Sequence, residues 1–116
     1  YALKNEPIPI YGDGSQTRTF CYVQDNIDFT IDIFKNNHFL NDVVNVGNDQ
    51  LTTIKELAEI IIDITNSKST IAYLPPLKEG DMTRRQPDIS KMRSVLNRDL
   101  TDIKVGIGNI LKVWGK

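Results

Sequence analysis

The chain has 116 residues, of which 40% are hydrophobic and 25% charged, and a formal net charge of −1 at pH 7; this is the balance of one ordinary globular domain. Basic and acidic residues are interspersed, which argues against a nucleic-acid-binding module, because such modules carry a basic excess. We expect neither a membrane span nor a signal peptide, and the single cysteine excludes an internal disulfide and favours an intracellular setting.

The amino-terminal stretch predicts a helix end followed by two β-like runs. Residues 1–4 read as the tail of a helix, and because the chain starts there we expect it to be an excised fragment. Residues 8–11 form the first β-like run, and residues 17–23, rich in Thr, Phe, Tyr and Val, form the second. The Asp13-Gly14 pair between the runs is typical of a hairpin turn, since glycine accepts the positive φ that such turns need.

Hydrophobic periodicity predicts about four helices in the rest of the chain. They cover residues 24–37, Thr53 to about Thr65, a short stretch from Asp88, and a last stretch from Thr101 or Asp102. In the first helix, the i, i+3, i+4, i+7 spacing predicts a buried face of Ile27, Thr30, Ile31 and Phe34. For the last helix the predicted apolar positions are Ile107, Ile110, Leu111 and Trp114.

Two further β-like runs and one capping signal complete the predicted order of elements. Residues 42–46 and 70–74 are rich in β-branched and aromatic side chains, so both are expected to be strands. Thr53 and Glu56 have capping-box spacing, which marks the start of the second helix. The mixture of strands and helices predicts an α/β or α+β fold over residues 1–116, as one small domain.

Two places in the sequence could bind an anion. Arg18 follows a glycine-rich turn, and backbone N–H groups with an arginine beside them can cradle a phosphate or diphosphate. The alternative is a solvated arginine on an edge strand after a plain turn. Arg84 and Arg85 are adjacent in a charged loop at residues 78–86, and arginine can bind carboxylate or phosphate in a bidentate way. These two arginines either meet an anionic ligand or belong to a solvated loop.

Several motifs resemble one enzyme family along nearly the whole chain. The segment YGDGSQTRTFCYVQD, residues 11–25, resembles the YGDGxQxRxFxxVxD segment of extended short-chain dehydrogenase/reductase enzymes. These are NAD-dependent nucleotide-sugar epimerases, 4,6-dehydratases and UDP-glucuronate decarboxylases. Residues 85–89, RQPDI, resemble the RKPDI motif of the decarboxylases, with Gln86 in place of Lys. Residues 78–81 are similar to the RxGD motif of the epimerase branch, with Lys78 in place of Arg.

The resemblance implies a set of substrate-binding residues, namely Pro9, Tyr11, Arg18, Asn45, Lys78 and Arg85. By resemblance, Pro9 and Tyr11 line the nucleotide base, and Arg18 binds the diphosphate. Asn45 matches the asparagine of an FNLG or YNIG segment near the nucleotide. Arg85 faces the carboxylate of a uronate sugar, which favours the decarboxylase branch; a nucleotide-sugar 4-epimerase or 4,6-dehydratase is the alternative. The lysine at position 78 loses the bidentate geometry of the family's arginine.

The chain lacks the motifs that the family uses for its cofactor and its chemistry. The glycine-rich GxxGxxG turn is absent, because Gly106-Ile107-Gly108 has the wrong spacing and no preceding strand, and the YxxxK pair is absent as well. The resemblance therefore implies that residues 1–116 are a carboxy-terminal, substrate-binding domain. We expect no catalytic residue, no metal and no NAD on it, and an NAD-binding Rossmann domain as its missing partner.

The whole enzyme implied by the resemblance acts on a UDP- or dTDP-sugar in the cytoplasm, as a homodimer. It would oxidise the sugar at C4 with tightly held NAD, form a 4-keto intermediate, and then decarboxylate, epimerise or dehydrate. Two other hypotheses remain open from the residues alone. One is a non-catalytic interaction domain with no sugar ligand. The other is a piece that mainly packs against a missing domain and folds poorly alone.

Overall fold

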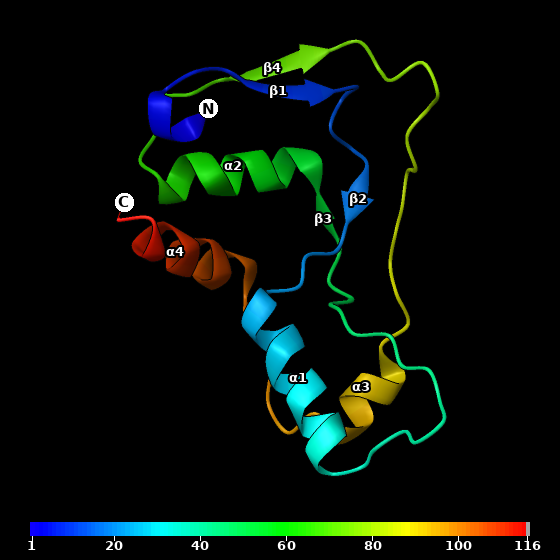
Figure 1. The fold of residues 1–116 in the computed structure, drawn as a ribbon. Helices are drawn as coiled ribbons and strands as arrows, with labels where there is room; N and C mark the ends of the chain where they lie inside the picture. The colour runs from blue at the N-terminus through cyan, green and yellow to red at the C-terminus, as the bar shows by residue number, and fades with distance from the viewer. Residues whose placement is uncertain (116) are drawn as a thin grey trace.

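The structure of the chain is a computed structural model that describes residues 1–115 (Figure 1). A short 3-10 helix at Ala2–Lys4 precedes the strands and helices. The elements that follow are β1 (Ile8–Tyr11), β2 (Thr17–Arg18), α1 (Val23–Lys35), β3 (Thr52–Thr53), α2 (Ile54–Ile64), β4 (Ile71–Leu74), α3 (Ser90–Val95) and α4 (Ile103–Val113). The predicted mixed α/β class with about four helices is confirmed in the described part of the chain. None of these helices combines the length and apolarity needed to cross a lipid bilayer.

The strands form two separate pairs, and the predicted hairpin is wrong. β1 pairs in parallel with β4, with Ile8 opposite Ile71, whereas β2 pairs antiparallel with β3. Gly12 and Gly14 do have the positive φ expected of the turn, 71° and 77°, but the turn leads the chain away from β1. The second run also ends at Arg18, because Tyr22 is the extended N-cap of α1.

Gly14 lets the turn after β1 pack closely on the start of α2. Its carbonyl oxygen accepts a hydrogen bond of 3.1 Å from the backbone N–H of Lys55. A Cβ at position 14 would lie 3.1 Å from the Cβ of Lys55, so a side chain has no room there. The turn therefore joins β1 to α2 and, through β2 and β3, sets the direction of the chain into α1.

α2 lies between the β1–β4 pair and α4 (Figure 1). It begins with the predicted capping box: the backbone N–H of Glu56 donates to the Thr53 hydroxyl, and the backbone N–H of Thr53 donates to the Glu56 carboxylate. In α4, Ile107 and Leu111 are half-buried as predicted, but Ile110 and Trp114 are 41% and 66% exposed. Gly106 of α4 is buried against the ring of Tyr22, where a Cβ would lie 3.2 Å from Cδ2.

The hydrophobic core lies between α1, α3 and the long segment that joins α1 to β3. Phe29, Ile89 and Met92 are buried at its centre, and the half-buried residues packed around them are Ile33, Phe39, Val44, Val46, Val95, Leu96 and Leu100. The predicted strand at 42–46 is wrong, because this segment pairs with no other strand in the described chain. Val44 and Val46 pack against the core, whereas Val43 is 79% exposed. Lys91 and Arg93 of α3 hold this part of the chain through ion pairs with Asp42 (2.7 Å) and with Asp49 just beyond the segment (2.6 Å).

The predicted buried face of α1 is also wrong. Ile27, Ile31 and Phe34 are 43%, 46% and 84% exposed, and Thr30 is exposed too. The buried side of the helix carries Asp25 and Phe29 instead, each 1% exposed. The helix has apolar residues on two roughly opposite faces, and α3 covers the face that carries Phe29.

Candidate functional site

The two arginine-bearing segments singled out from the sequence lie side by side. The backbone N–H of Thr17 donates to the carbonyl oxygen of Thr83 over 2.9 Å, and Thr17 forms a parallel bridge with Arg84. Arg18 Nη1 donates to the carbonyl oxygen of Met82 over 2.7 Å. β2 therefore holds the 78–86 loop in place, although more than sixty residues separate the two segments along the chain.

Arg18 is engaged with acceptors of the protein itself. Its Nη2 lies 2.5 Å from Oδ1 of Asp81, and Nη1 also donates to the carbonyl oxygen of Thr17 over 2.7 Å. A guanidinium has five N–H donors, and these contacts use three of them. The side chain is 21% exposed, so an incoming anion would use the two remaining donors or displace the Asp81 carboxylate.

Arg85 lines a hollow of about 390 Å³ that residues 46–48 also line. The other residues that line the hollow are Thr19, Cys21, Val46, Gly47, Asn48, Gln86 and Pro87. Arg85 Nη2 lies 3.6 Å from the sulfur of Met82. Because a thioether sulfur is a weak acceptor, the guanidinium charge stays available to a ligand. Burial raises the pKa of the Cys21 thiol, and the nearby Asp25 carboxylate raises it further, so Cys21 is a neutral wall of this hollow and not a nucleophile.

Gln86 and Asn45 hold the hollow together. Gln86 Nε2 donates to the carbonyl oxygen of Asp49 over 2.6 Å, and Gln86 accepts a hydrogen bond from Arg84. Asn45 Nδ2 donates to the carbonyl oxygen of Asp88 over 3.1 Å. Gln86, which stands where the RKPDI motif has lysine, thus links the two walls of the hollow. Asn45 connects its own segment to the RQPDI motif through its hydrogen bond to Asp88.

Pro9 and Tyr11 do not share this hollow. They lie on β1, where Pro9 is half-buried opposite Ala72 and Tyr11 is 50% exposed opposite Leu74. Lys78 is exposed in the same loop as Arg85 but is not among the residues that line the hollow. The structure therefore brings Arg18 and Arg85 to one loop, with Asn45 next to it, and leaves the two predicted base-contacting residues on the other sheet.

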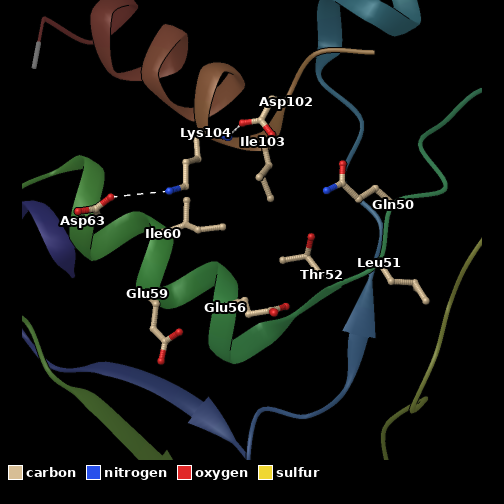
Figure 2. Close-up of a pocket in the computed structure, with 10 residues that line it drawn as sticks. All are labelled: Gln50, Leu51, Thr52, Glu56, Glu59, Ile60, Asp63, Asp102, Ile103 and Lys104. Atoms are coloured by element: carbon tan, nitrogen blue, oxygen red, sulfur yellow. Dashed lines mark hydrogen bonds and ion pairs between the residues drawn. The ribbon is translucent and has the colours of Figure 1, made fainter. Parts of the chain in front are cut away.

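A second hollow, of about 460 Å³, lies between α2, β3 and α4 (Figure 2). Glu56, Glu59, Asp63 and Asp102 line it, and the only cation among its lining residues is Lys104, 4.0 Å from Asp63. A wall with this excess of carboxylates repels phosphate and uronate groups. The hollow beside Arg85 is therefore the better candidate for an anionic ligand.

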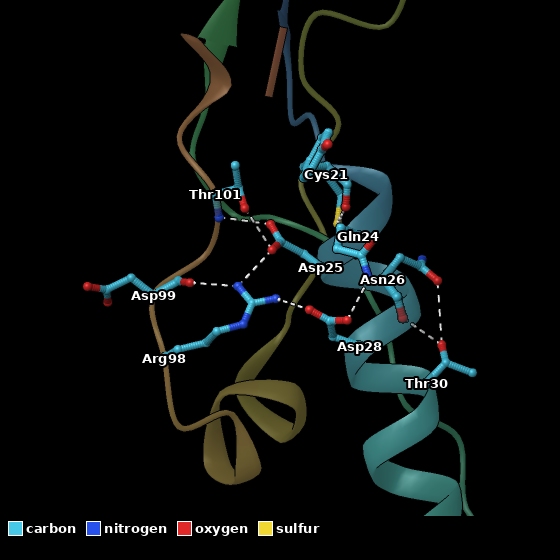
Figure 3. Close-up of polar contacts among 10 residues, drawn as sticks. Cys21, Gln24, Asp25, Asn26, Asp28, Thr30, Arg98, Asp99 and Thr101 are labelled. Atoms are coloured by element: carbon cyan, nitrogen blue, oxygen red, sulfur yellow. Dashed lines mark hydrogen bonds and ion pairs between the residues drawn. The ribbon is translucent and has the colours of Figure 1, made fainter. Parts of the chain in front are cut away.

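The sequence analysis missed a buried polar cluster that anchors α1 (Figure 3). Asp25 is 1% exposed and accepts hydrogen bonds from the backbone N–H of Thr101, the hydroxyl of Thr101 and Nη1 of Arg98, at 2.8, 2.8 and 2.7 Å. Burial raises the pKa of the Asp25 carboxyl, but these hydrogen bonds and the Arg98 charge outweigh burial and leave the pKa below its ordinary value. Asp28 pairs with Nη2 of the same arginine over 2.9 Å.

One signal in the sequence could have revealed this cluster. Asp25 lies four residues before Phe29, on the same helical face, and a carboxylate on a buried face needs a partner. Because α1 starts two residues after Cys21, the cluster also fixes one wall of the hollow. Its role is positional, since Asp25 does not line the hollow itself.

The residues of this chain do not fit the cofactor that the resemblance implies. Gly106 and Gly108 lie inside α4, not in a turn between a strand and a helix, so they offer no backbone cradle for a pyrophosphate. Within residues 1–115, no cluster of three or more His, Cys, Asp or Glu side chains could hold a metal ion.

Known proteins resemble this chain in sequence and in fold. A family model described as "NAD dependent epimerase/dehydratase family" matches residues 1–47. The chain is 39% identical over 116 residues to UDP-glucuronic acid decarboxylase 1 of Danio rerio, covering 99% of this chain and 27% of that protein. A structure of UDP-glucuronic acid 4-epimerase from Bacillus cereus, in complex with UDP-glucuronic acid and NAD, is 27% identical, with a TM-score of 0.74 over 91% of this chain and 33% of that one.

A further solved structure has a similar fold. The epimerase Mth375 of Methanothermobacter thermautotrophicus superposes with a TM-score of 0.84 over 98% of this chain and 35% of that one, at 24% identity. The chain therefore spans between a quarter and two fifths of the length of these relatives. Motifs, fold and relatives agree: the chain is similar to the NAD dependent epimerase/dehydratase family, whose model matches residues 1–47.

Proposed function

We propose that these residues form the carboxy-terminal, substrate-binding part of an NAD-dependent enzyme that modifies a nucleotide sugar through a 4-keto intermediate. UDP-glucuronate is the substrate that we favour, with decarboxylation as the reaction. The observation that carries this proposal is the position of Arg85: a guanidinium that pairs with no carboxylate among residues 1–115, on the wall of a hollow of about 390 Å³. Decarboxylase and uronate-epimerase relatives support the choice of a uronate.

The two arginines have separate roles in this proposal. Arg18 binds the diphosphate through the donors that Asp81 and the backbone carbonyls leave unused. Arg85 binds the sugar carboxylate in a bidentate way, which orients the sugar and neutralises its charge in the hollow. Pro9 and Tyr11 contact the base from β1, Asn45 lies near the nucleotide, and Lys78 offers a single charge at the loop. Epimerisation or dehydration of a related sugar is the alternative reaction.

The remaining parts of the enzyme lie outside these residues in our proposal. NAD, whose chemistry would be the reversible oxidation of the sugar, is bound by an amino-terminal Rossmann domain; in support, Gly106 and Gly108 lie inside α4 and form no glycine-rich turn after a strand. The 116 residues alone are therefore inactive. The complete protein is cytoplasmic and homodimeric, as the resemblance implies.

Calorimetric titration of the full-length protein with UDP, UDP-glucose and UDP-glucuronate tests the roles of both arginines. Arg85→Gln should weaken UDP-glucuronate binding about tenfold or more, because one charge-assisted contact of about 1.4 kcal/mol or more is lost. UDP and UDP-glucose should bind as before. Arg84→Gln is the matched control, since the guanidinium of Arg84 is directed to Gln86 and does not line the hollow. Equal losses for UDP-glucose and UDP-glucuronate would contradict the role of Arg85.

A second pair of variants separates ligand binding by Arg18 from its structural contact with the loop. Arg18→Gln should weaken all three UDP compounds, whereas Asp81→Asn keeps the guanidinium and removes its competing carboxylate, so UDP binding should be unchanged or tighter. If both variants weaken UDP equally, Arg18 serves only to hold the loop. If no UDP compound binds to the full-length protein, the non-catalytic interaction domain is the correct hypothesis.

A further inference from the structure

Two segments of the chain, residues 45–49 and residues 86–88, run past each other in opposite directions and contribute to the walls of the hollow beside Arg85. The contact made by Gln86 is the one next to Arg85 in the chain, so it has the most direct effect on the space in front of the guanidinium. Three contacts join the two segments: Asn45 Nδ2 donates to the carbonyl oxygen of Asp88 over 3.1 Å, Gly47 packs against Pro87, and Gln86 Nε2 donates to the carbonyl oxygen of Asp49 over 2.6 Å.

The side-chain amide of Gln86 has a hydrogen-bond partner at each end. Its oxygen accepts from Nη2 of Arg84, while its Nε2 donates to the main chain of Asp49. If the amide turned over, its oxygen would face the carbonyl oxygen of Asp49, so only one orientation satisfies both ends. The contact with Asp49 therefore needs an N–H donor at position 86, which a lysine also provides and a methionine does not.

Asp49 has a second tie, on its side chain. Arg93 of α3 donates to both carboxylate oxygens of Asp49, from Nη2 over 2.6 Å and from Nε over 3.2 Å. These side chains are 48% and 39% exposed, so solvent screens the pair and it contributes little to stability. The main chain of Asp49, which continues into the wall of the hollow, is held by Gln86 instead.

The hollow is suited to one anionic group. Arg85 is the only cation among the described residues that line it, and the neutral amide of Gln86 adds no second charge. Cys21 is neutral as well, because burial raises the pKa of its thiol. A guanidinium binds a planar carboxylate through two parallel hydrogen bonds, and this geometry requires that the ligand be confined to one position. The wall that confines the ligand is the one that Gln86 holds.

We propose that Gln86 is a positioning residue of this site: it holds residues 46–49 at a fixed distance from Arg85, so that the hollow fits a sugar with a single carboxylate. The identity of the sugar rests on the proposed function. Gln86 acts through the wall that it holds and through its neighbour Arg85, and no contact between its amide and the carboxylate is needed. Holding the wall before the ligand arrives lowers the ordering cost of binding, which raises affinity without a new contact.

Three variants of the full-length protein test this role. Gln86→Met keeps the length of the side chain and removes its N–H donor, and Gln86→Lys supplies a donor again. Arg93→Met is the matched control, because it removes the other tie to Asp49 and leaves the amide of Gln86 in place. Calorimetry gives the dissociation constants of UDP and UDP-glucuronate. Alkylation of Cys21 by iodoacetamide, quantified by peptide mass spectrometry without ligand, reports how open the hollow is.

We expect Gln86→Met to weaken UDP-glucuronate binding about fivefold, the order of one lost hydrogen bond, and UDP binding less than about twofold. Cys21 should react at least about threefold faster in this variant, because the wall opens more often. Gln86→Lys should restore the UDP-glucuronate affinity and the Cys21 rate to those of the wild type, and Arg93→Met should change neither.

Equal losses of UDP and UDP-glucuronate binding in Gln86→Met would overturn the proposal, and so would losses as large in Arg93→Met or an unchanged rate at Cys21. A Gln86→Lys variant that restores neither value would overturn it too. The proposed function fails separately: a wild-type protein that binds UDP but not UDP-glucuronate sinks the substrate, while the Cys21 rates still decide whether Gln86 holds the wall.

Discussion

Asp25→Asn is the substitution that most directly tests how the fold is held together. The carboxylate is 1% exposed and accepts three hydrogen bonds, two from Thr101 and one from Arg98. An asparagine keeps one acceptor oxygen and turns an amide N–H₂ group towards donors that need an acceptor. The neutral side chain also leaves Arg98 with Asp28 as its sole carboxylate partner.

The size of the effect follows from burial. Breaking a buried ion pair costs about 3–5 kcal/mol, but Arg98 is 38% exposed and stays solvated, so we expect a loss of about 2–3 kcal/mol. Asp28→Asn is the matched control, because Asp28 pairs with the same arginine over 2.9 Å but its side chain is 46% exposed. An exposed pair of this kind contributes about 0–1 kcal/mol.

Hydrogen exchange at the amide of Thr101 reports this contact locally, alongside urea unfolding of the full-length protein. In Asp25→Asn the protection of this amide should fall, since its acceptor is lost, while Asp28→Asn should leave it unchanged. Asp25 has a pKa below its ordinary value of 3.8 in the folded chain, so its contribution is complete at pH values well above 3.8 and is lost as the pH falls through the lowered pKa of the folded state. The difference between wild type and Asp25→Asn should therefore shrink in acid. Equal losses for Asp25→Asn and Asp28→Asn at pH 7 would refute the reasoning.

Two further predictions concern helix α4 and helix α2. Gly106→Ala should destabilise the protein by about 1 kcal/mol or more, because the new Cβ would lie 3.2 Å from the Tyr22 ring; Gly108→Ala, with no atom within 4 Å, should stabilise it by up to about 1 kcal/mol through helix propensity. Thermal unfolding of both variants checks the opposite signs, and a gain for Gly106→Ala would contradict the close packing. Thr53→Ala should cost about 1 kcal/mol by removing the capping box, whereas unchanged urea unfolding would show that the cap is dispensable.

The local signals in the sequence predicted structure well. The Thr53–Glu56 spacing gave the start of α2 to the residue, and the β1 bounds agree because Ile8 to Tyr11 is flanked by a proline and a glycine. The position of Gly14 was also informative, since glycine adopts at little cost the positive φ that this turn requires. Such features depend on a few neighbouring residues, so a single sequence contains them.

The wrong predictions concern features that depend on contacts between segments far apart in the sequence. The Asp13-Gly14 turn fits a hairpin, but the partner of β1 is β4, more than sixty residues further on. In α1, periodicity revealed one apolar face, although Phe29 lies on another, and the choice between the faces depends on α3. The segment at 42–46 has strand composition but no strand beside it to supply hydrogen bonds.

The candidate site was predictable only in part. The motifs marked Arg18 and Arg85, and the structure places both on or against the 78–86 loop. The residues next to Arg18 in the sequence did not indicate that it would pair with the Asp81 carboxylate. Nor did those next to Asp25 indicate that it would bind Arg98 and Thr101, more than seventy residues further on. These contacts are made by long side chains that reach between elements, and their partners follow from the fold.

The parallel pairing of β1 with β4 has a consequence for how the chain folds. Ile8 is opposite Ile71, so the first strand has no partner until residues 71–74 have left the ribosome. Closing a loop of this length costs on the order of 4 kcal/mol before any ladder bond compensates for it. The β1–β4 pair should therefore form later than the capped helix α2, whose contacts are local. During synthesis β1 stays an unpaired edge, and Pro9, which has no N–H to offer, leaves it poorly suited to pairing with the wrong strand.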